Sequence, residues 1–154
     1  MLFASRNHAL GFAERTRKNL QYIENASSAG ADVHVVTQLA NSLLGLIVFP
    51  WEKDFSKSVE ALQLDDLVKE GWPKWEVTMG SCQTLGQLMR YLRNAVAHGN
   101  VRFSSESRSI DDVTIEVENF PARATAPNWS AHIEATRLRE FCLRFIDLVE
   151  ERLG

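Results

Sequence analysis

Hydrophobic residues recur at intervals of three or four positions in four long stretches of the chain. These stretches run from about Ser5 to Ala26, from Val33 to Phe49, from Ser81 to Gly99 and from Ser130 to Arg152. Apolar side chains at this spacing form one face of an α-helix, which a globular protein buries in its core. The pattern therefore predicts four main helices, and Asp32 is the expected N-cap of the second.

The third of these helices has the clearest division into an apolar and a polar side. Its apolar side carries Leu85, Leu88, Met89, Leu92 and Val96, and its polar side carries Arg90, Arg93, Asn94, Ala97 and His98. Gly99 follows at once, and glycine is the residue that most often ends a helix in the left-handed conformation. We therefore expect the polar side to be exposed as far as the last turn.

The period of the hydrophobic pattern changes to two after the third helix. Apolar and polar residues alternate from Val101 to Phe103 and again from Val113 to Val117, with a serine-rich segment between them. This alternation predicts a β-hairpin from about Val101 to Glu118. The next segment, Asn119 to Asn128, contains two prolines and is expected to be irregular.

The connection between the second and third helices is less regular than the rest. We predict one short helix in it, from about Ser58 to Lys69. Three tryptophans lie in or beside this connection, and they either pin it to the helices or stack on the bases of a nucleic acid: Trp51, Trp72 and Trp75. Burial is the more common fate of a tryptophan in such a segment, and we expect it here.

Together these elements predict a mainly α protein. The expected fold is an antiparallel four-helix bundle with a small β-hairpin between the third and fourth main helices. A chain of 154 residues is long enough for one hydrophobic core, so residues 1–154 are expected to form a single domain. The formal net charge of −3 gives no overall attraction to nucleic acid, so any nucleic-acid site must be a local basic patch.

The sequence contains few candidates for metal, cofactor or thiol chemistry. Cys82 and Cys142 match no metal-binding spacing, and we expect two reduced and mostly buried thiols. Cys82 and His98 would lie ~24 Å apart on one helix, too far for a nucleophile and its base. No phosphate-binding loop, nucleophile elbow or zinc-binding H-E-x-x-H helix occurs, so we expect no cofactor and no metal.

The apolar segments are not typical of a membrane protein or a secreted one. The most apolar run, Leu43 to Trp51, is much shorter than the ~20 residues that cross a bilayer. Charged residues interrupt the first stretch of the chain every few positions, unlike a secretory signal. Together with the reduced thiols, this pattern predicts a cytoplasmic protein without membrane contact.

The end of the third helix contains an R-x4-H motif, Arg93 to His98, with a polar residue directly after the arginine. This motif, in the segment RNAVAHG, resembles the signature of the HEPN superfamily, small helical domains that are often metal-independent endoribonucleases. The segments ERTRKNL, TQLANSLLGLIVFPWE and FCLRF extend the resemblance over most of the chain, toward small single-domain HEPN proteins of bacteria or plasmids. Some HEPN toxins carry, two residues after the histidine, a tyrosine that a nucleotidyltransferase modifies; here Asn100 stands there.

The resemblance implies an RNA-cleaving site at the end of the third helix. His98 would accept the proton of the ribose 2′-hydroxyl, because imidazole titrates near neutral pH. Arg93 would stabilise the charged phosphorane, and Asn94 would hold the phosphate or orient His98. Arg90 and Arg102 are the candidates for binding the RNA chain. The expected products are a 2′,3′-cyclic phosphate and a 5′-hydroxyl end.

The same residues also allow other interpretations. A histidine before a C-cap glycine often only caps the last carbonyl groups of the helix, and an outward arginine is usually just solvated. The chain then would be a non-catalytic HEPN-like bundle that binds a protein partner or a nucleotide. If the site is active, a homodimer is expected, because Arg93 and His98 point about 140° apart around the helix axis. The sequence is compatible with three biological roles: a toxin that is controlled by an antitoxin protein, a defence effector, and a housekeeping nuclease.

Overall fold

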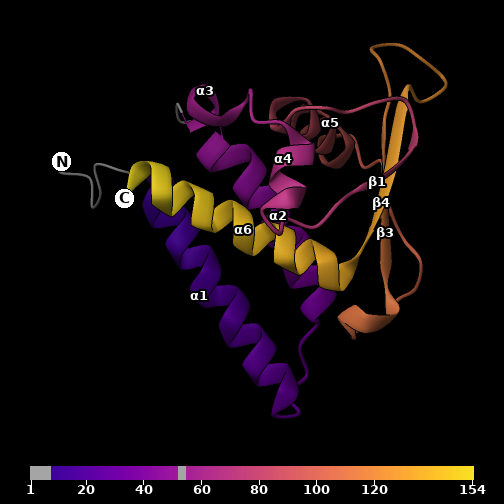
Figure 1. The fold of residues 1–154 in the computed structure, drawn as a ribbon. Coiled ribbons are helices and arrows are strands. Elements are labelled where there is room, and N and C mark those ends of the chain that lie inside the picture. The colour runs from indigo at the N-terminus through magenta and orange to yellow at the C-terminus, as the bar shows by residue number, and fades with distance from the viewer. Residues whose placement is uncertain (1–7, 52–54) are drawn as a thin grey trace, which may run out of the picture.

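The computed structural model describes residues 8–51 and 55–154, which form six α-helices and a four-stranded sheet (Figure 1). The helices are α1 (His8–Ser28), α2 (Val35–Pro50), α3 (Ser56–Val59), α4 (Leu64–Lys69), α5 (Leu85–Ala97) and α6 (Ala135–Leu153). The strands are β1 (Glu76–Met79), β2 (Val101–Phe103), β3 (Thr114–Asn119) and β4 (Trp129–Glu134). The first predicted helix began at Ser5, which lies outside the described residues.

The sheet is antiparallel throughout, with the strand order β1-β4-β3-β2. Ile115 and Val117 of β3 are buried while Glu116 between them is exposed, so the sheet has one face on the core and one in solvent. Figure 1 shows the sheet edge-on, with all the helices on one side of it. We call the helix-free side the outer face of the sheet.

Helix α5 lies between the other helices and the sheet. It packs on α2 on one side and on β3 on the other, while α1, α2 and α6 pack against one another. The buried face of α6 contributes Leu138, Phe141, Phe145 and Val149 to the same core. This arrangement leaves only the polar side of α5 for contact with solvent.

The prediction of a mainly helical protein is confirmed, but the β-structure is larger than predicted. The hairpin is present as β2 and β3, with Val101 opposite Val117 and Phe103 opposite Ile115. It continues into β4 and β1, which we had not predicted. Residues Ser130–Glu134 were assigned to the start of the last helix, and this was wrong because alternate side chains of this segment pack on the core from a strand, and the helix begins at Ala135.

Two helix boundaries also differ from the prediction for local reasons. The N-cap of α2 is His34, whose Nδ1 accepts a hydrogen bond from the backbone N–H of Thr37 at 3.2 Å, and not Asp32. Asp32 instead forms an ion pair with Arg108. The short helix predicted from Ser58 to Lys69 is two helices, α3 and α4, because the chain turns between them to reach Thr84.

The tryptophans of the connection are buried, as expected. Trp72 and Trp75 both pack edge-on against Phe141 of α6, with ring centroids 5.6 and 5.9 Å away. Trp51 contacts Phe55 and Phe145. All three are buried, so these tryptophans hold the connection down. No helix in the described part of the chain is long and apolar enough to cross a membrane.

Candidate functional site at the end of helix α5

The beginning of α5 is fixed by a capping box. The Thr84 hydroxyl accepts from the backbone N–H of Gln87 at 3.2 Å, and the Gln87 side chain accepts from the backbone N–H of Thr84 at 3.3 Å. This reciprocal pair satisfies N–H groups that the first turn would leave unpaired. It also explains why the helix begins at Leu85 and not, as predicted, at Ser81: the signature Thr-x-x-Gln was present in the sequence.

The end of α5 is a Schellman motif that holds His98 at the C-cap. The backbone N–H of Gly99 donates to the carbonyl of Val96 at 3.2 Å, and that of Asn100 donates to the carbonyl of Ala95 at 2.7 Å. Gly99 adopts φ 70°, the left-handed conformation that glycine takes without strain. The N–H of Glu118 then bonds to the carbonyl of Asn100, which ties the helix end to β3.

The buried side of α5 agrees closely with the predicted stripe. Leu85, Leu88, Met89 and Leu92 are buried; the fifth buried residue is Ala95, while the predicted Val96 is only half-buried. On the opposite side Arg90, Ala97 and His98 are exposed, and Arg93 and Asn94 are half-buried. The structure therefore presents four predicted site residues on one side of one helix, with Arg93 and His98 on opposite flanks of the small Ala97.

Arg90 and Arg93 border an open groove of about 360 Å³ beside the first half of α5. Trp51 and Glu60 form its other wall. Arginine is the side chain best suited to bind phosphate oxygens with two parallel hydrogen bonds. The groove thus supplies the local basic surface that an acidic protein needs if it is to bind a nucleic-acid backbone.

Asn94 is part of a chain of side-chain amides that the sequence did not reveal. Its Nδ2 donates to Oδ1 of Asn119 at 3.2 Å, and Nδ2 of Asn119 donates to Oδ1 of Asn128 at 2.7 Å. Asn119 is buried at the end of β3. Because one amide hydrogen of Asn94 is already used, its Oδ1 and second hydrogen are what it offers to a ligand. Asn119 lies 25 residues from Asn94 in the sequence, and no local pattern connects them.

His98 has an exposed imidazole ring, and no other residue in the described ranges hydrogen-bonds to that ring. Its backbone N–H donates to the carbonyl of Asn94 at 3.1 Å and so continues the helix. The ring itself caps no carbonyl group among the described residues. The His98 ring is therefore open to solvent.

Arg102 does not join the other candidates. It lies on the outer face of the sheet, opposite α5, where its guanidinium pairs with Glu116 and Glu118 of β3. The hydrogen bond that Arg102 donates to Glu116, together with the charges of both carboxylates, raises the pKa of Arg102 above its ordinary value. A phosphate at Arg102 would have to displace two carboxylates.

The two cysteines are free, as expected. Cys82 is half-buried and Cys142 is buried. Burial raises the pKa of Cys82 to about 11 and that of Cys142 to about 12. Both thiols are thus protonated at neutral pH and are poor nucleophiles. No group of three or more histidine, cysteine or acidic side chains in residues 8–51 and 55–154 is arranged to hold a metal ion.

A small, mainly helical domain with an R-x4-H motif at the exposed end of one helix defines the class of protein to which the resemblance pointed. The chain belongs to the HEPN pEK499 p136 family, whose model matches residues 4–153. The match covers nearly the whole chain and confirms the resemblance. Neither a curated protein nor a solved structure matches the chain.

Proposed function

We propose that the protein is a metal-independent endoribonuclease and that its active site lies on the exposed side of α5. The observation that carries this proposal is the open imidazole of His98 on the same side of the helix as Arg90, Arg93 and Asn94. Membership of a HEPN family supports a role in RNA cleavage or nucleotide binding in general.

The proposed reaction uses the nucleophile that RNA itself carries. His98 accepts the proton of the 2′-hydroxyl, the 2′-oxygen attacks the adjacent phosphorus, and the bond from phosphorus to the 5′-oxygen breaks. The imidazolium then returns a proton to the leaving 5′-oxygen. Arg93 stabilises the extra negative charge on the phosphorane, and the products are a 2′,3′-cyclic phosphate and a 5′-hydroxyl end.

Two chains are proposed to build one cleft. Arg93 and His98 lie five positions apart, so their side chains leave the helix about 140° apart, which is wide for one chain to focus on one phosphate. A two-fold axis beside Ala97 would bring the same side of a second α5 opposite, and the small side chain permits close approach. Arg90 and Arg93 of both chains would then line the cleft.

The test is cleavage of single-stranded RNA by the purified protein in the presence of a chelator. Cleavage should continue without metal, DNA of the same sequence should stay intact because it lacks the 2′-hydroxyl, and the products should carry 2′,3′-cyclic phosphate ends. If cleavage needs magnesium, or if RNA is bound but not cut, the function is instead that of a HEPN-like binding domain.

A mixing experiment tests the composite site separately. His98→Ala and Arg93→Ala chains are each expected to be inactive, but a mixed dimer contains one site with both native residues if the two residues of a site come from different chains. Random mixing should then restore about a quarter of the native activity. The composite site is ruled out if the mixtures are as inactive as their components. It is also ruled out if light scattering finds only monomers at high micromolar concentration.

A further inference from the structure

A small apolar pocket lies between α4 and β1. We call it the α4–β1 pocket; its walls include Val68, Trp72, Trp75, Val77, Cys82 and Phe141. Its volume is about 80 Å³. Small-molecule sites usually measure about 300–1,000 Å³, so this pocket suits a single side chain and not a cofactor.

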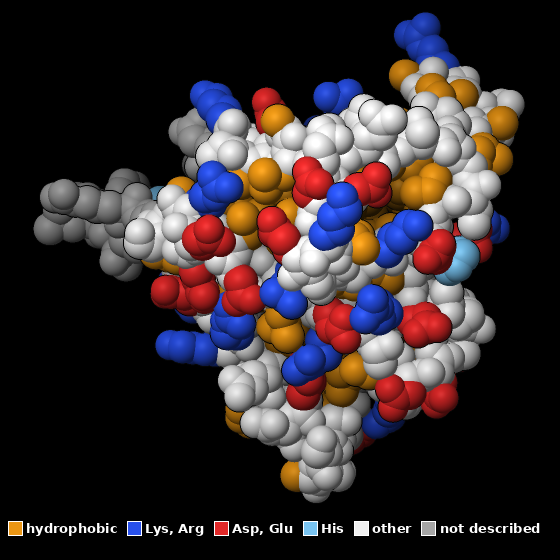
Figure 2. Space-filling view, in the orientation of Figure 1, with side chains coloured by type: hydrophobic (Ala, Val, Ile, Leu, Met, Phe, Trp, Pro, Cys, Tyr) orange, Lys and Arg blue, Asp and Glu red, His pale blue; other side chains and the backbone are white. Residues whose placement is uncertain are grey.

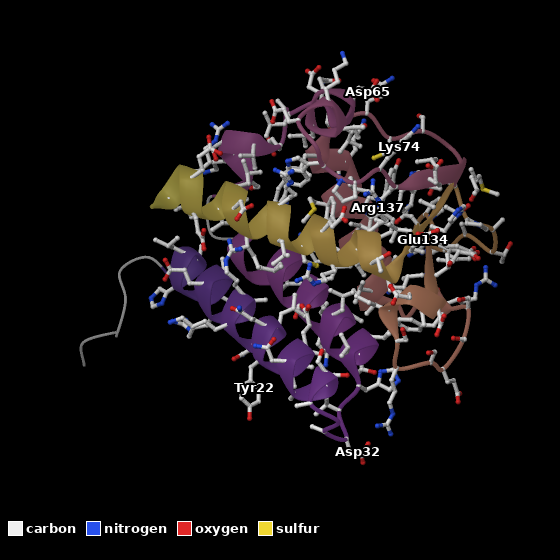
Figure 3. All side chains as sticks on the ribbon, turned by 60° about the horizontal axis from the view of Figure 1, so that its bottom comes forward. Tyr22, Asp32, Asp65, Lys74, Glu134 and Arg137 are labelled. Atoms are coloured by element: carbon white, nitrogen blue, oxygen red, sulfur yellow. The ribbon has the colours of Figure 1, made fainter. Side chains whose placement is uncertain are left out.

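The mouth of the α4–β1 pocket is apolar as well. Val68 of α4 and Val77 of β1 line it and are 37% and 38% exposed, unusually high for valine in a packed domain. Asp65 and Lys74 also line the pocket, from α4 and from the segment that leads into β1 (Figure 3). In Figure 2 hydrophobic side chains reach the surface in this region between charged ones.

Strand β1 forms one edge of the sheet, directly beside this pocket. It pairs with β4 on one side only, and all four of its residues are exposed. Val77 lies opposite Ala131, a buried residue, so Val77 is on the helix-covered side of the sheet, where the pocket opens. An edge strand offers backbone N–H and C=O groups that only another extended chain can pair in regular order.

The indole of Trp75 lines the wall of the α4–β1 pocket and is 5% exposed. Its Nε1–H has no hydrogen-bond acceptor among the described residues, and the same holds for Trp129, which does not line the pocket. Both nitrogens are shielded from the surface, so a chain bound outside would not reach them. The Trp75 ring is instead a reporter of whether the pocket is filled.

From the unpaired edge strand and the apolar pocket beside it, we propose that the α4–β1 pocket and the free edge of β1 form a docking site for an extended segment of a partner protein. The segment adds a strand beside β1 and inserts one large apolar side chain, such as leucine, between Val68 and Val77. Recognition by strand addition obtains affinity from the backbone bonds and specificity from such a pocket. This site is separate from the proposed cleft on α5 and does not depend on its activity.

The test uses three short capped peptides and the native protein labelled with ¹⁵N. The first peptide has a central leucine between threonines and valines, the second has aspartate in place of leucine, and the third has N-methylated backbone amides. The first should shift the indole resonance of Trp75 and protect amide hydrogens of Glu76–Met79 from exchange. The second and third should bind at least tenfold more weakly, because one lacks the apolar anchor and the other the backbone donors.

Two variants give a matched control. Val77→Asp brings a charge to the mouth of the pocket and should abolish the shift. Phe103→Asp changes an apolar residue of similar exposure on β2, the opposite edge of the sheet, and should leave the shift unchanged. Circular dichroism checks that both variants are folded; if Val77→Asp is not, Val68→Asp replaces it. The proposal fails if the leucine peptide leaves the Trp75 indole unmoved, or if all three peptides bind alike.

Discussion

The side-chain amide of Asn94 donates to Oδ1 of Asn119 across 3.2 Å, and this bond joins the last turn of α5 to the end of β3. Asn119 is buried and donates in turn to Asn128. The polar side of α5 is thus held by the sheet as well as by its own helix caps. Replacing Asn119 would therefore remove the acceptor that holds the side chain of Asn94 at the candidate site.

Asn119→Ala should destabilise the fold by about 1–3 kcal/mol, because it removes both hydrogen bonds of a buried amide. Denaturant unfolding measures the loss. Asn128→Ala is the control: Asn128 is exposed, so water replaces its lost bond and the cost should be smaller. Free energies of unfolding equal to that of the native protein for both variants would show that the amide chain contributes nothing to stability.

His98→Ala and Arg93→Ala should each keep the native thermal midpoint and lose most of the proposed ribonuclease activity. Both residues lie off the buried stripe of α5, and general base catalysis contributes typically about 10²–10⁴-fold, so the loss for His98→Ala should be at least about a hundredfold. The control is His132→Ala on the outer face of the sheet. An active His98→Ala protein, in a preparation free of host ribonuclease, would show that the His98 side chain has no part in cleavage.

Arg90→Gln should weaken RNA binding more than Arg102→Gln does. Both arginines are exposed, but the guanidinium of Arg102 is paired with Glu116 and Glu118 on an acidic surface, whereas Arg90 borders the open groove beside α5. Titration of a labelled, non-cleavable RNA at several salt concentrations measures this, and loss of a phosphate contact should reduce the salt dependence by about one unit of slope. If Arg102→Gln weakens binding more than Arg90→Gln does, the RNA binds along the sheet and not along α5.

Gly99→Ala should destabilise the protein by about 1–2 kcal/mol, the cost of a side chain in the left-handed conformation. Nothing lies within 4 Å of the position where the new Cβ would be, so the effect is one of backbone strain and not of a clash. Thermal unfolding measures it. Gly30→Ala, also left-handed with open space around it but far from α5, should cost about the same without changing RNA cleavage, whereas Gly99→Ala should also lower cleavage by moving His98.

Alkaline pH should destabilise the fold through Cys142. Its pKa is about 12 in the folded protein, above the ordinary thiol value, so the folded state holds the proton more tightly than the unfolded state. The stabilisation is complete below about pH 8.5 and decreases by roughly 1.4 kcal/mol per pH unit as pH rises toward the folded pKa. Unfolding by denaturant at several pH values should show this slope in the native protein. Cys142→Ala should unfold more easily at neutral pH but lack this part of the slope, with little change in activity.

The sequence by itself determined α5 and what it exposes. Its assignment needed only local information: the apolar stripe sets which side is buried, Thr84 and Gln87 mark the start, and Gly99 marks the end. For the same reason the exposure of Arg90 and His98 followed from their spacing relative to Leu88 and Leu92. The β2–β3 hairpin was equally local, since its strands are neighbours in the chain.

Only the tertiary structure decided the contacts between distant segments. β1 and β4 are short, and they pair across about fifty residues, as Glu76 with His132, so neither carries enough local pattern to distinguish a strand from a loop or a helix start. The bond from Asn94 to Asn119 and the pairing of Arg102 with Glu118 depend on that sheet. Local periodicity fixes which side of an element faces the core; which side chains then meet is fixed by how the elements pack.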